Sequence, residues 1–208
     1  MTTEYTLYYA PGACSISPQI ALREAGLPFK LERVDLRAKK LTDGGDWLAI
    51  NPKGYVPALK APNGEVLTEG AIMVQFIADQ VPDKALAPKH GTTERLRMAE
   101  WLHYIATELH KGMSPLYNPI AGDDYKKQLK TERLASRWGI LANHLRDKQF
   151  IMGDRFTVAD GYAFYVLRAW QHSAKEDLAK WPELQAYYTR LAARPSIAAS
   201  LEAEGLKP

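Results

Sequence analysis

The sequence contains one cysteine, Cys14, whose thiol is a candidate nucleophile. Cys14 follows the turn-forming run Ala10-Pro11-Gly12 and precedes Ser17-Pro18, which is typical of the start of a helix. A thiol beside a helix N-terminus lies at the positive end of the helix dipole, and this favours the thiolate. A single cysteine is nevertheless more often a small apolar residue without a chemical role. Its position alone leaves both interpretations open.

Two other features suit a peptide-like ligand. Val56-Pro57 opens a predicted strand, and a cis bond there would present the backbone of Val56 to an extended ligand. Because X-Pro bonds are rarely cis, the local pattern alone favours trans. Glu69-Gly70 begins a predicted helix, where Gly70 lets a carboxylate approach and Glu69 can accept from an ammonium group. The simpler alternative is that Thr68 or Glu69 only caps this helix.

A third group of polar residues lies on one predicted helix of the second half. His103, Thr107 and His110 are separated by four and three residues, so an α-helix would place them on one face. Such a face suits the wall of a ligand cleft. From spacing alone, the two histidines could instead be ligands of a metal ion or surface residues, and ordinary histidine exposure favours the surface interpretation.

The elements that must position these residues differ between the two halves of the chain. Residues 1–81 predict the order β-α-β-α-β-β-α, with a parallel β-α-β unit first and an antiparallel hairpin at Asn63-Gly64. Residues 82–92 read as a linker between prolines. Residues 93–208 predict an all-helical domain, whose helices are expected at 93–112, 124–146, 157–171, 182–194 and 196–203. The fold class is therefore α/β plus all-α.

The segment Thr157-Val158-Ala159-Asp160 has the spacing of a helix capping box, with aspartate in place of the usual glutamate or glutamine. We interpret it as a folding signal. Thr157 and Asp160 are therefore left out of the candidate site.

Composition excludes several classes of function. The net charge of +3 is spread along the chain without a long basic run, so neither nucleic acid nor a membrane is an expected partner. One cysteine excludes an internal disulfide, and no zinc-site spacing is present, so no metal is expected. The N-terminus lacks the features of a signal peptide, and no apolar run is long enough to cross a bilayer, so we expect a cytoplasmic protein.

Several motifs occur together in one order, and in this combination they resemble the bacterial beta-class glutathione S-transferases. The thioredoxin-like half carries three of them: Ala10-Pro11-Gly12-Ala13-Cys14-Ser15, Ala49-Ile50-Asn51-Pro52-Lys53-Gly54-Tyr55-Val56-Pro57-Ala58-Leu59 and Leu67-Thr68-Glu69-Gly70-Ala71-Ile72. The helical half carries the segments 101–111 and 156–160 and the tail Ala203-Glu204-Gly205-Leu206-Lys207. The resemblance covers nearly the whole chain.

The resemblance implies a glutathione site with assigned residues. It makes Val56-Pro57 a cis peptide, with Val56 pairing with the cysteinyl backbone of glutathione. The remaining contacts that it implies are the γ-glutamyl group at Glu69 and Gly70, the glycine end at Lys39, the sulfur at Cys14 and His110, and further binding residues at His103, Thr107, Glu108 and Leu109. His103 departs from the family pattern, which usually has asparagine there, and an imidazole cannot offer the donor and acceptor of an amide.

The expected activity is conjugation of reduced glutathione to electrophilic, largely apolar compounds, with Cys14 and His110 as the catalytic residues. Cys14 also suits thiol-disulfide exchange. The alternative is a non-catalytic binding or interaction module on the same fold. No cofactor is expected beyond glutathione as co-substrate, and the resemblance implies a homodimer. The sequence does not specify the electrophile.

Overall fold

The computed structural model describes residues 4–207, which form two compact units. The first unit comprises Met1–Ala87 and Arg194–Pro208, and the second comprises Pro88–Ala193.

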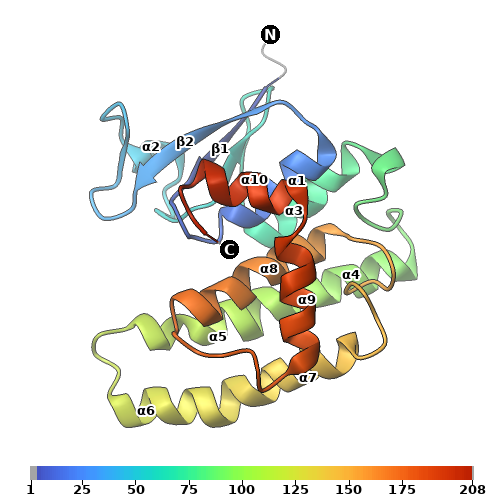
Figure 1. Ribbon diagram of the computed structural model, residues 1–208. Helices are drawn as coiled ribbons and strands as arrows, with labels where there is room; N and C mark the ends of the chain where they lie inside the picture. The colour runs from blue at the N-terminus through green and yellow to red at the C-terminus, as the bar shows by residue number, and fades with distance from the viewer. Residues whose placement is uncertain (1–3, 208) are drawn as a thin grey trace. The chain divides into compact units, whose positions relative to one another are not determined.

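The first unit is built on a five-stranded sheet with the order β3-β2-β1-β4-β5 (Figure 1). The strands are β1 (Tyr5–Tyr9), β2 (Phe29–Asp35), β3 (Lys40–Leu41), β4 (Ala58–Lys60) and β5 (Val66–Thr68). β1 and β2 are parallel, and all other pairs are antiparallel. The predicted β-α-β unit and hairpin are confirmed. The two-residue β3 was not predicted, because so short a strand has no periodicity of its own.

The helices of the N-terminal part are α1 (Ile16–Ala25), α2 (Trp47–Ile50), α3 (Gly70–Asp79) and the short η1 (Pro82–Lys84). α1 begins after Ser15, so the predicted start at Ser17-Pro18 was slightly late. The Ser15 hydroxyl lies 3.3 Å from both the amide nitrogen and the carbonyl oxygen of Ala10. Cys14 therefore ends a strand-to-helix loop, as expected.

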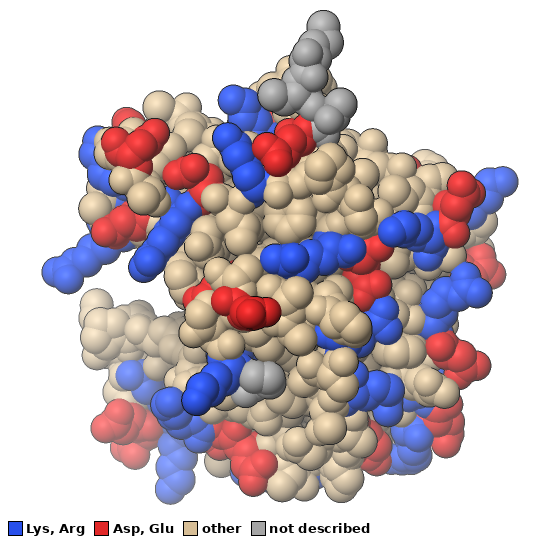
Figure 2. Space-filling view, turned by 45° about the horizontal axis from the view of Figure 1, so that its top comes forward, with Lys and Arg blue, Asp and Glu red and all other residues tan. Residues whose placement is uncertain are grey.

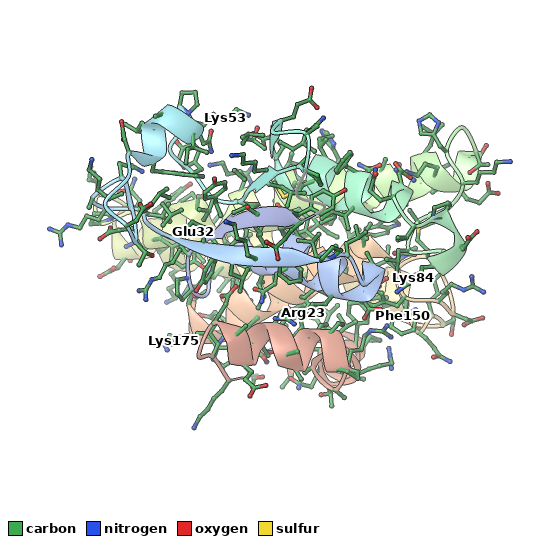
Figure 3. The ribbon with its side chains drawn as sticks, turned by 90° about the horizontal axis from the view of Figure 1, so that it is seen from above. Arg23, Glu32, Lys53, Lys84, Phe150 and Lys175 are labelled. Carbon is green, nitrogen blue, oxygen red and sulfur yellow. The ribbon has the colours of Figure 1, made fainter. Side chains whose placement is uncertain are left out.

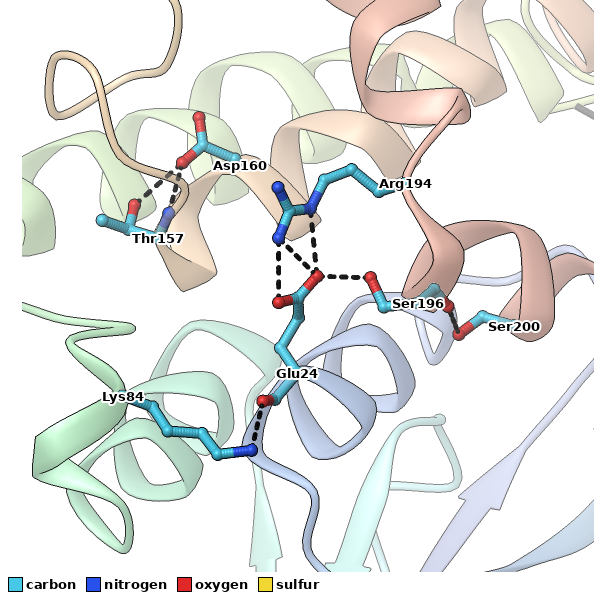
Figure 4. Close-up of polar contacts among 7 residues, drawn as sticks. All are labelled: Glu24, Lys84, Thr157, Asp160, Arg194, Ser196 and Ser200. Carbon is cyan, nitrogen blue, oxygen red and sulfur yellow. Dashed lines mark hydrogen bonds and ion pairs between the residues drawn. The ribbon is translucent and has the colours of Figure 1, made fainter.

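The last helix, α10 (Pro195–Ala203), packs against α1 and belongs to the first unit. The carboxylate of Glu24, near the end of α1, accepts hydrogen bonds from the Arg194 guanidinium and the Ser196 hydroxyl (Figure 4). Lys84 donates to the Glu24 carbonyl at 3.2 Å. The sequence analysis placed α10 in the helical domain 93–208. In the structure α10 belongs to the first unit instead, because it packs against α1 and pairs with residues of that helix.

The second unit is helical throughout its regular elements. They are α4 (Thr93–Tyr104), the π-helical η2 (Ile105–His110), α5 (Lys111–Met113), η3 (Ser114–Tyr117), α6 (Asp123–Gln128), the π-helical η4 (Leu129–Leu134), α7 (Ala135–Leu145), α8 (Val158–His172) and α9 (Pro182–Ala192). The predicted helices are confirmed to within a few residues at each end. The π-helical segments were not predicted, because they interrupt long helices without breaking the apolar pattern.

Asp160 organises the start of α8. Its side chain is fully buried and accepts from the Ile151 amide at 2.8 Å, the Thr157 amide at 2.7 Å and the Thr157 hydroxyl at 3.0 Å. The Tyr187 hydroxyl of α9 also donates to it. Burial raises the pKa of Asp160, and the donated hydrogen bonds act in the opposite direction. The predicted capping box is confirmed (Figure 4) and also joins α8 to α9.

No helix among residues 4–207 is long and apolar enough to span a membrane. On the face drawn in Figure 2, Lys and Arg side chains are interspersed with Asp and Glu side chains rather than gathered into one large area.

Replacing Asp160 with alanine should lower the free energy of unfolding by about 3 kcal/mol, because several buried donors lose their acceptor. Urea denaturation of the wild type and the Asp160→Ala variant measures this difference. Asp154→Ala is the control, because Asp154 is exposed in the loop before α8. This substitution should change the free energy of unfolding by less than about 0.5 kcal/mol. Equal effects of the two substitutions would contradict this role.

Candidate active site

The loop Asn51–Pro57 is the part of the first unit where the predicted site residues meet. The amide side chain of buried Asn51 donates to the Tyr55 carbonyl at 2.7 Å and accepts from the Lys53 amide at 3.2 Å. The Asn51 carbonyl accepts from the Gly54 amide at 2.9 Å. One side chain thus satisfies backbone groups on both sides of the turn. Sequence reasoning missed Asn51, although Asn-Pro is a turn signal.

The Val56-Pro57 bond is cis, as the family resemblance implied. The Val56 side chain is buried in a cluster with Tyr8 and Trp47. Ala13 packs against this cluster from the cysteine loop, which is the segment 10–15 between β1 and α1. The Cys14 thiol donates to the Val56 carbonyl with a sulfur-to-oxygen distance of 3.4 Å. Packing and a hydrogen bond therefore bring Cys14 to Val56, across 42 positions of sequence.

Lys39 is held at the same loop. Its ammonium donates to the Gly54 carbonyl at 2.9 Å. Gly54 has a φ of +69°, and a Cβ there would lie 3.4 Å from the Lys39 Nζ atom. Gly54 therefore provides both the backbone conformation and the room that Lys39 uses.

Glu69 and Gly70 lie at the start of α3. Glu69 has a φ of +69°, which is uncommon for a residue with a side chain. Its carboxylate pairs with Lys53 at 2.6 Å, and Lys53, labelled in Figure 3, also donates to the Thr68 hydroxyl at 3.0 Å. Glu69 is the N-cap residue of α3, but its side chain makes no capping hydrogen bond. A Cβ on Gly70 would lie 3.9 Å from Pro57, so the start of α3 adjoins the cis bond.

Lys53 was not singled out from the sequence, because its partner lies 16 positions away. The Lys53 and Glu69 side chains are 50% and 66% exposed. An ion pair this exposed contributes little to stability. The two groups can therefore exchange their partners for the charges of a ligand at small cost.

In the second unit, His110 lies in a polar cluster with two tyrosines of α8. The Nδ1 atom is 2.9 Å from the Tyr162 hydroxyl, and the Nε2 atom is 3.2 Å from the Tyr165 hydroxyl. Burial, with a smaller contribution from the charge of Lys111, lowers the pKa of His110 to about 4. The imidazole is thus neutral at neutral pH, with one ring nitrogen donating and the other accepting. Tyr162 and Tyr165 were missed, although a spacing of three places them on one helix face.

The other predicted residues of this segment have different environments. Thr107 is exposed and donates to the carbonyl of His103, also exposed, at 3.0 Å. Glu108 pairs with Arg137 of α7, and the Leu109 side chain is fully buried. Ile105–His110 is π-helical, so the α-helical spacing used for 103, 107 and 110 does not hold across it. His110 is the residue of this segment that lies within hydrogen-bond distance of the α8 tyrosines.

Within the part of the chain from residue 4 to residue 207, no group of three or more His, Cys, Asp or Glu side chains is arranged to hold a metal ion.

Comparison with known proteins identifies the family. Residues 13–80 match the family described as the glutathione S-transferase N-terminal domain, and residues 107–204 match the corresponding C-terminal domain. The chain is also 44% identical over 201 residues to glutathione S-transferase GstA of Escherichia coli O157:H7, which covers 97% of this chain and 99% of the relative. The chain belongs to the glutathione S-transferase family.

Two solved structures of family members agree with this assignment. A beta-class glutathione S-transferase of Sphingomonas chungbukensis is 44% identical, with a TM-score of 0.91 over 97% of this chain and 100% of that one. A sphingomonad glutathione S-transferase solved with glutathione is 39% identical, with the same TM-score and coverage. The predicted beta-class resemblance and the thioredoxin-like plus helical fold of this glutathione S-transferase are confirmed.

His110 should titrate with a midpoint near pH 4, well below the ordinary value of about 6.5. The folded state therefore takes up this proton less readily than the unfolded chain does. His110 accordingly favours unfolding as the pH falls from about 6.5 to about 4. Nuclear magnetic resonance of the five histidines, with His110→Gln used for assignment, measures the midpoint. A midpoint near 6.5 would contradict the buried, neutral imidazole.

Proposed function

We propose that this member of the family conjugates reduced glutathione to electrophilic, largely apolar compounds. The observation that carries the proposal is the Asn51–Pro57 loop, around which Cys14, Lys39 and the Lys53–Glu69 pair gather. Full-length similarity to glutathione S-transferases supports catalysis and gives no support to the alternative of a non-catalytic module.

We assign glutathione to this loop as an extended peptide. The backbone of Val56 pairs with the cysteinyl residue, and the Lys39 ammonium binds the glycine carboxylate. The γ-glutamyl group has one positive and one negative charge. Glu69 accepts from its ammonium, while Lys53 and the amides at Gly70 bind its carboxylate. The exposed ion pair between Lys53 and Glu69 supports this assignment, because each charge matches one end of the amino-acid group.

The reaction requires the glutathione thiolate. The thiol loses its proton to solvent, the sulfur lone pair attacks the electrophilic carbon to form a C–S bond, and the leaving group departs with its bonding pair. We propose that Cys14 lies at this sulfur and lowers the thiol pKa by donating a hydrogen bond to it. The family resemblance also gives His110 this donor role. Because both of its ring nitrogens already face the hydroxyls of Tyr162 and Tyr165, we propose that the neutral His110 exchanges one of these partners for the thiolate.

Cys14 supports a second activity on the same site, thiol-disulfide exchange. The Cys14 thiolate attacks oxidised glutathione, a mixed disulfide forms on Cys14, and glutathione thiolate leaves. Cys14 cannot be both the mixed disulfide and a hydrogen-bond donor at one time, so the two activities compete.

The family resemblance also assigns the segment containing His103, Thr107, Glu108 and Leu109 to glutathione binding. We propose that exposed His103 and Thr107 make these contacts in a two-fold homodimer, with glutathione held by the partner subunit. Light scattering should give twice the 23.3 kDa mass of the chain at micromolar concentration. A mass of one chain would overturn the dimer.

We place the enzyme in the cytoplasm, where glutathione is kept reduced.

Conjugation is tested with glutathione and 1-chloro-2,4-dinitrobenzene. His110→Ala should lower kcat about tenfold or more, because a donor to the thiolate is lost. Glu69→Gln should mainly raise the KM for glutathione, about tenfold. The control His90→Ala, at an exposed histidine, should match the wild type. Wild-type protein that binds glutathione but turns over no electrophile, disulfide or peroxide would overturn the proposal.

A further inference from the structure

The tail motif Ala203-Glu204-Gly205-Leu206-Lys207 has no role in the site described above. After α10 the chain reverses direction, because Gly205 has a φ of +68°. The Gly205 amide donates to the Glu202 carbonyl at 2.9 Å, and the Leu206 amide donates to the Leu201 carbonyl at 2.8 Å. This turn fixes the residues that follow α10 against the end of that helix.

The side chain of Glu204 joins the tail to the cysteine loop. Its Oε2 atom accepts from the Gly12 amide at 2.8 Å, across 192 positions of sequence. Glu204 is only 8% exposed, although nothing in its residue type favours burial. The tail also packs here, because a Cβ on Gly12 would lie 4.0 Å from the Leu206 side chain.

Helix stability does not explain this carboxylate. Glu204 is the C-terminal capping residue of α10, where a negative charge opposes the helix dipole. Burying a carboxylate also costs solvation free energy unless it is well paired. The hydrogen bond from the Gly12 amide is a contact that offsets part of these two costs.

The loop that receives this bond leads directly to the thiol. Within it the Ala13 amide donates to the Ala10 carbonyl at 3.1 Å, while the Gly12 amide donates to Glu204 of the tail. Gly12 has a φ of +74°, so its orientation is specific. Cys14 follows two residues later and reaches the Val56 carbonyl. Holding Gly12 therefore restricts where the Cys14 sulfur lies.

We infer that Glu204 is a positioning residue for Cys14, which acts by anchoring the Gly12 amide so that the thiol stays at the Val56 carbonyl. Its effect on conjugation rests on the function proposed above. Its effect on the reactivity of the Cys14 thiol does not depend on that function, because alkylation of Cys14 is measured without glutathione.

The test uses Cys14 as the single cysteine of the chain, so that its rate of alkylation by iodoacetamide reports one site. Glu204→Ala removes the anchor and should speed alkylation about fivefold or more, because the thiol leaves the Val56 carbonyl. Glu204→Gln keeps an oxygen acceptor for the Gly12 amide and should stay within about twofold of the wild type. Glu202→Ala, at an exposed glutamate near the same end of α10, is the matched control and should not change the rate.

Circular dichroism and the urea midpoint establish that each variant is folded. If Glu204→Ala does not fold, Glu204→Asp tests the inference in its place. The aspartate keeps the charge, but its carboxylate lies one methylene further from the Gly12 amide, so this variant should also speed alkylation of Cys14. Folded Glu204→Ala or Glu204→Asp with a wild-type rate would overturn the inference. A Glu204→Gln rate equal to that of Glu204→Ala would also overturn it, because charge and not anchoring would then be responsible.

Conjugation kinetics separate this inference from the proposed function. Glu204→Ala should lower kcat while Glu204→Gln retains it. A protein without any conjugating activity whose Glu204 variants still show the alkylation pattern would overturn the proposed function and support the positioning role.

Discussion

The candidate site of the first unit depends on one buried amide. Asn51 bonds to the backbone on both sides of a tight turn, so the Asn51–Pro57 loop holds its shape without being part of the sheet. Lys39, Cys14 and the start of α3 all adjoin this loop, two through its carbonyl oxygens and the third through Pro57. A buried amide is costly unless all of its groups are satisfied, which makes the arrangement specific.

Backbone conformation carries much of the chemistry of this unit. Gly12, Gly54 and Glu69 all have positive φ. The Gly12 amide meets the Glu204 carboxylate, and the Gly54 carbonyl meets the Lys39 ammonium. At the two glycines this conformation has little steric cost. At Glu69 it does have a cost, which is consistent with a site where function and not stability selects the conformation. The carboxylate that results is exposed and paired with Lys53.

The Lys53–Glu69 pair of the first unit and His110 of the second differ in exposure. In the first unit the charges of Lys53 and Glu69 are exposed, so water screens them and a ligand can replace either partner. In the second unit His110 is held between Tyr162 and Tyr165, and burial keeps it neutral. The neutral imidazole has one donor and one acceptor, and the two tyrosine hydroxyls face both ring nitrogens.

Local sequence determined the longer helices and most of the strands and their order, because apolar periodicity, turn residues and the Thr157–Asp160 capping box act over a few neighbouring residues. It also determined that Cys14 ends a strand-to-helix loop. The partners of the site residues were decided only in three dimensions. Cys14 meets Val56, Lys53 meets Glu69, and Gly12 meets Glu204 across separations that no periodic pattern records. Such contacts arise from packing between elements, and a sequence specifies packing only through the whole fold.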